Sequence, residues 1–118
     1  MVSAVHHIHL KKLMHRDLKP GNIFLSKDGE VKVGDFGLAA VIKDAVSRQN
    51  YNMYGTDLYM APELKNYDRY NYKVDIYSLG LMLFELFYHM ENSVECFMIL
   101  VDVRNNKFPE EFTKNFGK

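Results

Sequence analysis

The chain has 118 residues, of which 47% are hydrophobic and 25% charged, and its 15 basic residues balance 15 acidic ones. This composition indicates one small globular domain that buries roughly 65% of the surface exposed by the unfolded chain, and it excludes two full domains and intrinsic disorder. A net charge of zero excludes a long-range field that would gather nucleic acid or an anionic membrane.

The single cysteine, Cys96, excludes an intrachain disulfide and a cysteine cluster for zinc. This sparing use of cysteine is typical of a reducing compartment, so we expect the cytosol or the nucleus, and we predict a cytoplasmic location. The most apolar run, residues 79–84, is far shorter than the ~20 residues that cross a bilayer. We therefore expect no membrane segment in this chain and no signal peptide.

The first half of the chain predicts a helix followed by a hairpin. Residues 2–13 have the spacing of an amphipathic helix, which must end before Pro20 and Gly21. Two short apolar runs, 23–25 and 31–33, flank an Asp-Gly pair, which is typical of a tight hairpin turn. We expect these runs to pair as antiparallel strands.

The second half predicts a long loop and two helices. Residues 38–60 lack a regular pattern, and loops of that length are usually functional. Residues 73–90 carry apolar side chains around nearly the whole helix circumference, so we expect this helix to be buried. A last helix is expected over residues 93–105, with a polar tail after Phe108-Pro109. The predicted fold class is mainly α with a short β-hairpin.

Three motifs follow one another in a fixed order. His15-Arg16-Asp17-Leu18-Lys19-Pro20-Gly21-Asn22 leads into the hairpin, the hairpin delivers Asp35-Phe36-Gly37, and the chain then reaches Ala61-Pro62-Glu63. Taken singly, each motif is explained as well by ordinary turn and loop residues. Together, their order and spacing resemble the C-terminal half of a protein kinase. The resemblance implies a truncated C-terminal kinase lobe (α+β), a partial kinase domain over residues 1–118 from the end of kinase helix E to about helix G.

The motif residues suit phosphoryl transfer from ATP. Magnesium prefers hard oxygen ligands, so Asn22 and Asp35 are suitable holders, and ATP and Mg²⁺ are the expected cofactors. The resemblance implies that Asp17 orients the attacking hydroxyl and accepts its proton, while Lys19 steadies the transferring phosphate. We expect the hairpin to set Asn22 and Asp35 side by side, and Gly37 to let the backbone reverse.

Further residues are expected to support this site. At a helix N-terminus, attraction to the helix dipole of about 0.3–1 kcal/mol would by itself explain the charge of Asp75. The resemblance implies instead that Asp75 holds the backbone of the His-Arg-Asp loop, which we favour because an idle buried charge is costly. It also places Thr56 beside Asp17, pairs Arg16 with a phosphorylated loop residue, and assigns to Glu63 an arginine partner that this chain lacks.

The loop after Asp35-Phe36-Gly37 contains candidate phosphorylation sites. The available acceptors are Ser47, Tyr51, Tyr54 and Thr56. Tyr51 stands where the kinases that this chain resembles commonly carry a threonine.

Other features have plainer interpretations. His6, His7, His9 and His15 have no acidic or cysteine partner at ligand spacing, so we expect surface or packing histidines and no metal site. Lys43 ends a motif that mimics the phosphate-pairing lysine of kinases, but it follows Asp35 instead of preceding it, so we expect it to be solvated. The Tyr and Met residues of 51–60 are expected to pack onto the domain.

Segments outside the catalytic motifs, which are less specific, narrow the resemblance to one group of kinases. Segments 20–25, 33–39, 73–81 and 103–109 resemble the serine/threonine kinases of the alpha subunit of eukaryotic translation initiation factor 2, although NIMA-like mitotic kinases could share them. In the first group, the helix that corresponds to residues 93–105 docks the substrate. The resemblance implies this alpha subunit as protein partner, no direct nucleic acid partner, and a longer parent that could form dimers.

The chain begins just before the catalytic loop, and its seven glycines include no Gly-x-Gly-x-x-Gly motif. We therefore expect the nucleotide-binding lobe to be absent, with weak nucleotide binding and little or no kinase activity in the isolated chain. Competing interpretations are a non-catalytic decoy that binds a substrate or a full-length kinase through residues 93–105, and a partial gene model.

Overall fold

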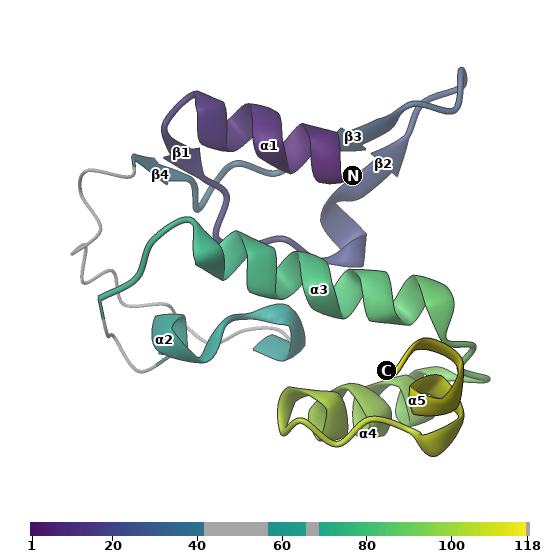
Figure 1. Ribbon diagram of the computed structural model, residues 1–118. Coiled ribbons are helices and arrows are strands. Elements are labelled where there is room, and N and C mark those ends of the chain that lie inside the picture. The colour runs from purple at the N-terminus through teal and green to yellow at the C-terminus, as the bar shows by residue number, and fades with distance from the viewer. Residues whose placement is uncertain (42–56, 66–68, 118) are drawn as a thin grey trace.

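The computed structural model describes residues 1–41, 57–65 and 69–117. One helix, α3, runs through the middle, with α1 and the strands on one side of it and η3, α2 and α4 on the other (Figure 1). The predicted fold class, mainly helical with a short hairpin, is confirmed. In chain order the elements are α1 (Val2–Leu10), β1 (Leu13–Met14), the 3-10 helix η1 (Pro20–Asn22), β2 (Ile23–Leu25), β3 (Val31–Val33), β4 (Ala40–Val41), the 3-10 helix η3 (Asp57–Tyr59), α2 (Pro62–Lys65), α3 (Lys73–Phe87), α4 (Ser93–Arg104) and α5 (Glu110–Phe116).

The predicted hairpin forms from β2 and β3. The two strands are antiparallel, and Phe24 of β2 pairs with Lys32 of β3. Gly29 in the connecting turn has a φ of 78°. Glycine adopts this left-handed backbone without the steric penalty that a side chain brings, which is why the Asp28-Gly29 pair marks the turn.

The helix at the start ends earlier than predicted, at Leu10 and not at Leu13. Lys12 has a φ of 61° directly after the helix and redirects the chain, so that Leu13–Met14 pairs with Ala40–Val41. The segment predicted as one long loop, residues 38–60, therefore contains a strand and the 3-10 helix η3. A strand of two residues whose partner lies far along the chain leaves no periodic signal. The rest of that predicted loop, residues 42–56, lies outside the described residues.

Helix α3 organises the core but is not buried on nearly every side, so that prediction is wrong. It ends at Phe87 and not at residue 90, and Ile76, Leu86 and Phe87 are 47%, 71% and 66% exposed. Neither α3 nor any other helix in the described ranges is long and apolar enough to cross a bilayer.

Three buried clusters surround α3 and tie the remaining elements to it. All three take residues from α3, which explains why this helix is more apolar than an amphipathic surface helix. The clusters consist of Val5, Leu18, Leu79 and Met82; of Leu81, Phe84, Leu100 and Val103; and of Ala61, Leu64 and Val74.

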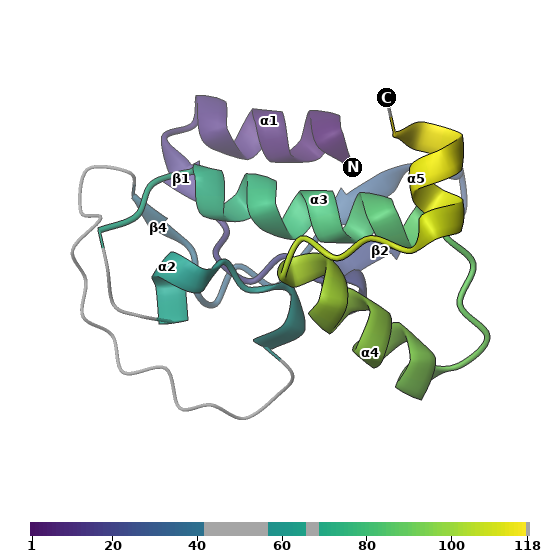
Figure 2. The ribbon, with the colours of Figure 1, turned by 60° about the horizontal axis from the view of Figure 1, so that its bottom comes forward.

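The predicted polar tail is a helix, α5, beside the C-terminal end of α3 (Figure 2). Pro109 precedes its first residue, a position where proline is tolerated because that N–H has no helical partner. The ring centre of Phe112 lies 4.8 Å from that of Phe84 and 4.9 Å from that of Phe116. These aromatic contacts between distant parts of the chain stabilise α5. The sequence of α5 alone is too short and too polar to predict a helix.

Candidate active site

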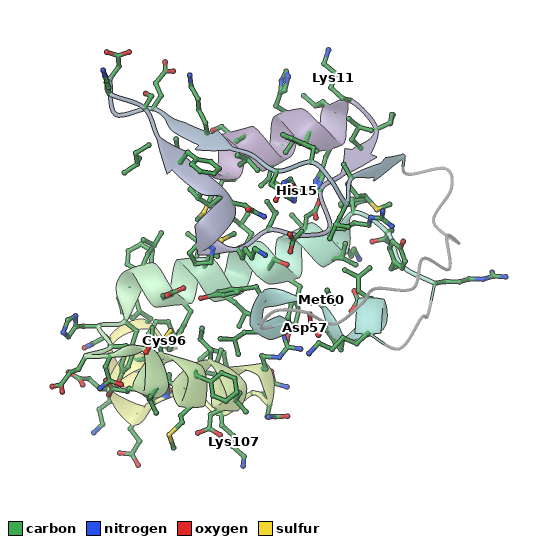
Figure 3. The ribbon with its side chains drawn as sticks, turned by 180° about the vertical axis from the view of Figure 1, so that it is seen from behind. Lys11, His15, Asp57, Met60, Cys96 and Lys107 are labelled. Atoms are coloured by element: carbon green, nitrogen blue, oxygen red, sulfur yellow. The ribbon has the colours of Figure 1, made fainter. Side chains whose placement is uncertain are left out.

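The buried carboxylate of Asp75 fixes the backbone of the His-Arg-Asp motif. Its Oδ1 accepts a hydrogen bond from the Arg16 N–H at 2.8 Å, and its Oδ2 accepts one from the His15 N–H at 2.9 Å. The Nε2 of His9 lies 2.8 Å from the same Oδ2. These are the backbone contacts expected from the sequence, and they anchor the loop to α3 directly before Asp17. Figure 3 labels His15 of this loop.

His9 has an acidic partner that its own sequence neighbourhood does not contain. The partner, Asp75, lies on another helix, and the two side chains form a hydrogen bond. Within residues 1–41, 57–65 and 69–117, no group of three potential metal ligands of the His, Cys, Asp and Glu types occurs. His6 and His7 are exposed, whereas His15 is fully buried.

His15 links the Asp17 loop to the strand that precedes Asp35. Its Nε2 lies 2.8 Å from the Gly34 carbonyl oxygen, and its Nδ1 accepts a hydrogen bond from the Asp17 N–H at 3.2 Å. A carbonyl only accepts and a backbone N–H only donates, so these contacts require the neutral imidazole with its proton on Nε2. The ring centre lies 5.0 Å from that of Phe36, which holds the second motif against the first.

The structure brings Asp17, Lys19 and Asn22 together. The Asn22 Nδ2 donates to the backbone oxygen of Asp17 at 2.8 Å and to its Oδ2 at 3.2 Å. The Lys19 Nζ lies 3.4 Å from the same Oδ2. The backbone oxygen and Oδ2 of Asp17 can only accept hydrogen bonds, so the amide nitrogen of Asn22 must face Asp17. The amide oxygen of Asn22 is then left for another partner.

The hairpin carries Asp35 to the neighbourhood of Asn22. The Gly34 N–H donates to the backbone oxygen of Asn22 at 2.9 Å, which extends the pairing of β2 and β3 by one residue pair. Asp35 is the next residue after this pair. Its side chain is exposed, and its Oδ1 accepts a weak hydrogen bond from the Gly37 N–H at 3.3 Å. An amide oxygen and a carboxylate are hard donors, so Asn22 and Asp35 fit a magnesium ion.

The backbone reversal expected at Gly37 lies at Asp35, whose φ is 55°. Among the described glycines, only Gly29 has a positive φ. Glycine at position 37 instead avoids a close contact, because a Cβ there would lie 3.2 Å from Asp35 Oδ1.

Two motif residues have a left-handed backbone, which for a residue with a side chain costs about 1–3 kcal/mol. They are Arg16, with a φ of 67°, and Asp35. Two further described residues other than glycine have a positive φ, Lys12 and Asn106. Each follows the end of a helix, where a left-handed backbone is common. Strain away from a helix end is typical of functional sites.

Arg16 connects the loop after the hairpin to the approach of α3. Its guanidinium donates through Nε to the Leu38 carbonyl and through Nη1 to the Tyr70 hydroxyl at 2.8 Å. The phosphorylated loop residue expected as its partner lies outside the described residues, with the candidate acceptors Ser47, Tyr51, Tyr54 and Thr56, and so does Lys43.

Glu63 of the third motif lies half-buried in the first turn of α2. Its neighbour Ala61 is fully buried, so the motif is part of the core beside α3. Within the described part of the chain, Glu63 has no ion pair.

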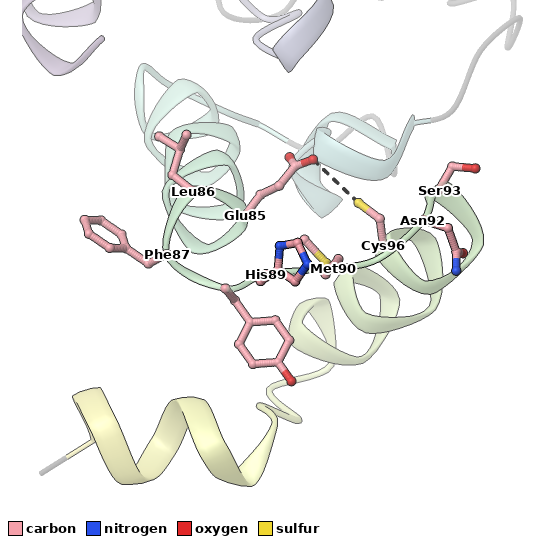
Figure 4. A pocket seen from close by; sticks show the side chains of 9 residues that line it. Glu85, Leu86, Phe87, His89, Met90, Asn92, Ser93 and Cys96 are labelled. Atoms are coloured by element: carbon pink, nitrogen blue, oxygen red, sulfur yellow. Dashed lines mark hydrogen bonds between the residues drawn. The ribbon is translucent and has the colours of Figure 1, made fainter.

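A second polar cluster, which the sequence did not predict, lies beside a pocket of about 590 Å³ at the C-terminal end of α3. The Tyr59 hydroxyl donates to Glu85 Oε2 at 2.7 Å. The Cys96 thiol donates to Glu85 Oε1 at 3.6 Å, the bond dashed in Figure 4. Burial, together with the Glu85 charge, raises the pKa of the Tyr59 hydroxyl and of the Cys96 thiol above their ordinary values. The three residues come from separate elements, so no contiguous sequence motif predicts the cluster.

Comparison with known proteins agrees with the motifs. Residues 1–97 match the family described as protein kinase domain. The chain is 45% identical over 127 residues to rat eukaryotic translation initiation factor 2-alpha kinase 3, with 98% of the chain and 12% of that protein covered. It is 39% identical over 135 residues to human eIF-2-alpha kinase GCN2, with 95% of the chain and 8% of that protein covered.

A third relative is the rat interferon-induced, double-stranded RNA-activated protein kinase, which is 42% identical over 120 residues. That alignment covers 100% of the chain and 23% of the relative. The chain thus spans less than a quarter of the length of these relatives. The match over most of the chain shows that it belongs to the protein kinase family.

Proposed function

We propose that this chain is the catalytic half of a serine/threonine kinase, which transfers a phosphoryl group from ATP to a protein hydroxyl. The observation that carries the proposal is the hydrogen-bonded cluster of Asp17, Lys19 and Asn22, which the hairpin joins to Asp35. Magnesium, when bound, neutralises the phosphate charge and would be held by the amide oxygen of Asn22 and the carboxylate of Asp35.

The cluster leaves one carboxylate oxygen of Asp17 available for the substrate. Asn22 and Lys19 both lie against Oδ2. In the described part of the chain, Oδ1 has no hydrogen bond, so this oxygen is placed to accept the proton of an attacking hydroxyl. Lys19 lies next to the carboxylate as a compact positive charge, suited to steadying the phosphoryl group that approaches the same hydroxyl.

We further propose that the substrate is the alpha subunit of translation initiation factor 2 and that the protein acts in the cytoplasm. The names of two relatives support this choice of substrate. The helix expected to dock the substrate, α4, exposes Val94, Phe97 and Met98 at 67%, 50% and 62%. Their spacing of three and four residues places them on one helix face, and an exposed apolar face is typical of a protein contact.

Catalysis by these residues is testable in a chimera that carries this chain in place of the segment of the rat kinase that aligns with it. The chimera should phosphorylate the alpha subunit. Asp17→Asn should lower kcat by about 10²- to 10⁴-fold, because the proton acceptor is lost, with little change in the KM for ATP. Asp28→Asn, at the exposed hairpin turn, is the matched control and should leave kcat unchanged. Equal effects of both substitutions would contradict the assignment of Asp17.

The second candidate function is a decoy, which the exposed face of α4 favours because docking there requires no nucleotide. A folded chimera that binds the alpha subunit and transfers no phosphate would support the decoy over the kinase. A chimera that phosphorylates other proteins in preference to the alpha subunit would support the NIMA-like alternative.

A further inference from the structure

One arginine joins the helix α4 to the segment that precedes the Ala-Pro-Glu motif. The Nη1 of Arg104 donates to the carbonyl oxygens of Leu58 and Met60, each at 2.7 Å. Its guanidinium carbon lies 5.3 Å from the ring centre of Tyr77 on α3. Figure 3, in which Asp57 and Met60 are labelled, shows this segment between α3 and α4.

Side chains of the two helices bind three consecutive carbonyls of the segment. The Ser78 hydroxyl of α3 donates to the Tyr59 carbonyl at 2.7 Å, between the two carbonyls that Arg104 binds. Backbone groups that lose such partners when buried cost free energy comparable to a lost hydrogen bond. The conformation of residues 57–60 therefore depends on side chains of α3 and α4.

The segment also reaches the catalytic loop. Tyr59 packs against the buried cluster that contains Leu18, the residue directly after Asp17. Contacts thus run without interruption from Arg104 through Tyr59 to the neighbour of the proposed proton acceptor.

Arg104 lies at the border between the buried and the exposed face of α4. Leu100 and Val103 are buried against α3, whereas Phe97 and Met98 are exposed, and Phe97 precedes Arg104 by seven residues on nearly the same side of the helix. A protein that binds the exposed face would therefore lie close to the side chain of Arg104.

We propose that Arg104 is a positioning residue, which fixes residues 57–60 to α4 so that docking on the exposed face of α4 further orders this segment. The inference rests on the proposed function and deepens it, because it links the docking helix to the segment beside the catalytic loop. Arginine suits this role since one Nη1 group donates to two carbonyl oxygens while the planar face of the guanidinium lies over the Tyr77 ring, and lysine has no such planar face.

The first experiment measures amide hydrogen exchange in the free 118-residue chain. Arg104→Met should speed exchange of the peptide that covers residues 57–65 by about tenfold, because two hydrogen bonds are lost, while α1 stays protected. Arg104→Lys should show a smaller increase, and Arg69→Met, at an exposed arginine, should show none. Unchanged exchange in Arg104→Met would overturn the proposal, as would an equal loss of protection in α1.

The second experiment adds the recombinant alpha subunit as the probe. Its binding should slow exchange of residues 57–65 in the unsubstituted chain, and Arg104→Met should lose this slowing while Arg104→Lys keeps part of it. Phe97→Asp should abolish binding without changing the exchange of residues 57–65 in the free chain. Equal slowing in the unsubstituted chain and in Arg104→Met would overturn the coupling. If the unsubstituted chain does not bind the alpha subunit, the proposed substrate fails, and the free-chain experiment alone decides whether Arg104 positions the segment.

Discussion

At the scale of single residues, the buried Asp75 carboxylate decides whether the catalytic loop keeps its shape. It accepts hydrogen bonds from two backbone N–H groups of the loop and lies in contact with His9, and it is 1% exposed. The buried carboxylate and the buried N–H groups need one another as hydrogen-bond partners, because each is costly to bury without them.

Asp75→Ala should lower the free energy of unfolding by about 3–5 kcal/mol, since it leaves buried N–H groups without an acceptor. Asp75→Asn, which keeps an acceptor oxygen, should cost about 1–3 kcal/mol. Denaturation in urea measures both, and Asp102→Ala, at an exposed position on α4, is the control. A loss for Asp75→Ala no larger than for the control would show that this carboxylate does not hold the loop.

The Tyr59–Glu85–Cys96 cluster makes stability depend on pH in a definite direction. Folding raises the pKa of the Cys96 thiol above its ordinary value of 9.0 and also raises the pKa of Tyr59. A group whose pKa is raised by folding stabilises the folded state fully below the unfolded pKa, and that contribution is lost as the pH rises toward the folded pKa. The free energy of unfolding should therefore fall once the pH exceeds 9.0.

Urea unfolding across a series of alkaline pH values measures this fall. Glu85→Gln should make the fall shallower, because it removes the charge that opposes ionisation of both neighbours. Cys96→Ala should remove only the part that the thiol contributes. Identical pH dependence in the unsubstituted chain and in Glu85→Gln would refute the contribution of the cluster.

Prediction from sequence succeeded at this scale where the residues of a site are contiguous. Asp17, Lys19 and Asn22 stand within one motif, so their proximity follows from the chain itself. The partners of His9 and Cys96 lie on other helices, and nothing in their local sequence identifies them. The turn at Asp35 was also missed, because glycine is the residue that local rules assign to such a backbone.

At the level of elements, the predicted starts of α3 and α4 agree with the structure, and the start of α4 has a side-chain cap. The Asn92 side chain accepts hydrogen bonds from the N–H groups of Val94 and Glu95 at 3.1 and 3.0 Å, and α4 begins at the predicted residue, Ser93. By contrast, β1, β4 and α5 depend on pairing or packing with distant residues. Such elements escape prediction since their local sequence is short and carries no period.

Asn92→Ala should reduce the free energy of unfolding by about 1 kcal/mol, because two N–H groups at the start of α4 lose their acceptor. Asn92→Asp keeps an acceptor at the same place and should be nearly neutral. Thermal unfolding followed by circular dichroism compares the two. A larger loss for the aspartate than for the alanine would contradict the capping role.

At the scale of the whole molecule, α3 connects the catalytic loop to the proposed docking surface. Asp75 in its first turn holds the loop, and Phe84 near its end packs against α4 and α5. The sequence predicted the loop from its motif, and the resemblance implied a docking role for the helix that is α4, but neither predicted the segment at residues 57–60 that lies between them. That segment depends on side chains of two helices, and such contacts exist only in the folded chain.

Asp17, Asn22 and Asp35 should behave as one metal site, and paramagnetic broadening by Mn²⁺, used in place of Mg²⁺, measures this. In the nuclear magnetic resonance spectrum of the chain, amides of residues 17–22 and 34–37 should broaden together at the lowest Mn²⁺ concentrations. Asp35→Asn should abolish the broadening in both segments at those concentrations, whereas Asp28→Asn at the hairpin turn should leave it unchanged. Broadening that stays in residues 17–22 after Asp35→Asn, or that affects only one of the two segments, would contradict a shared site.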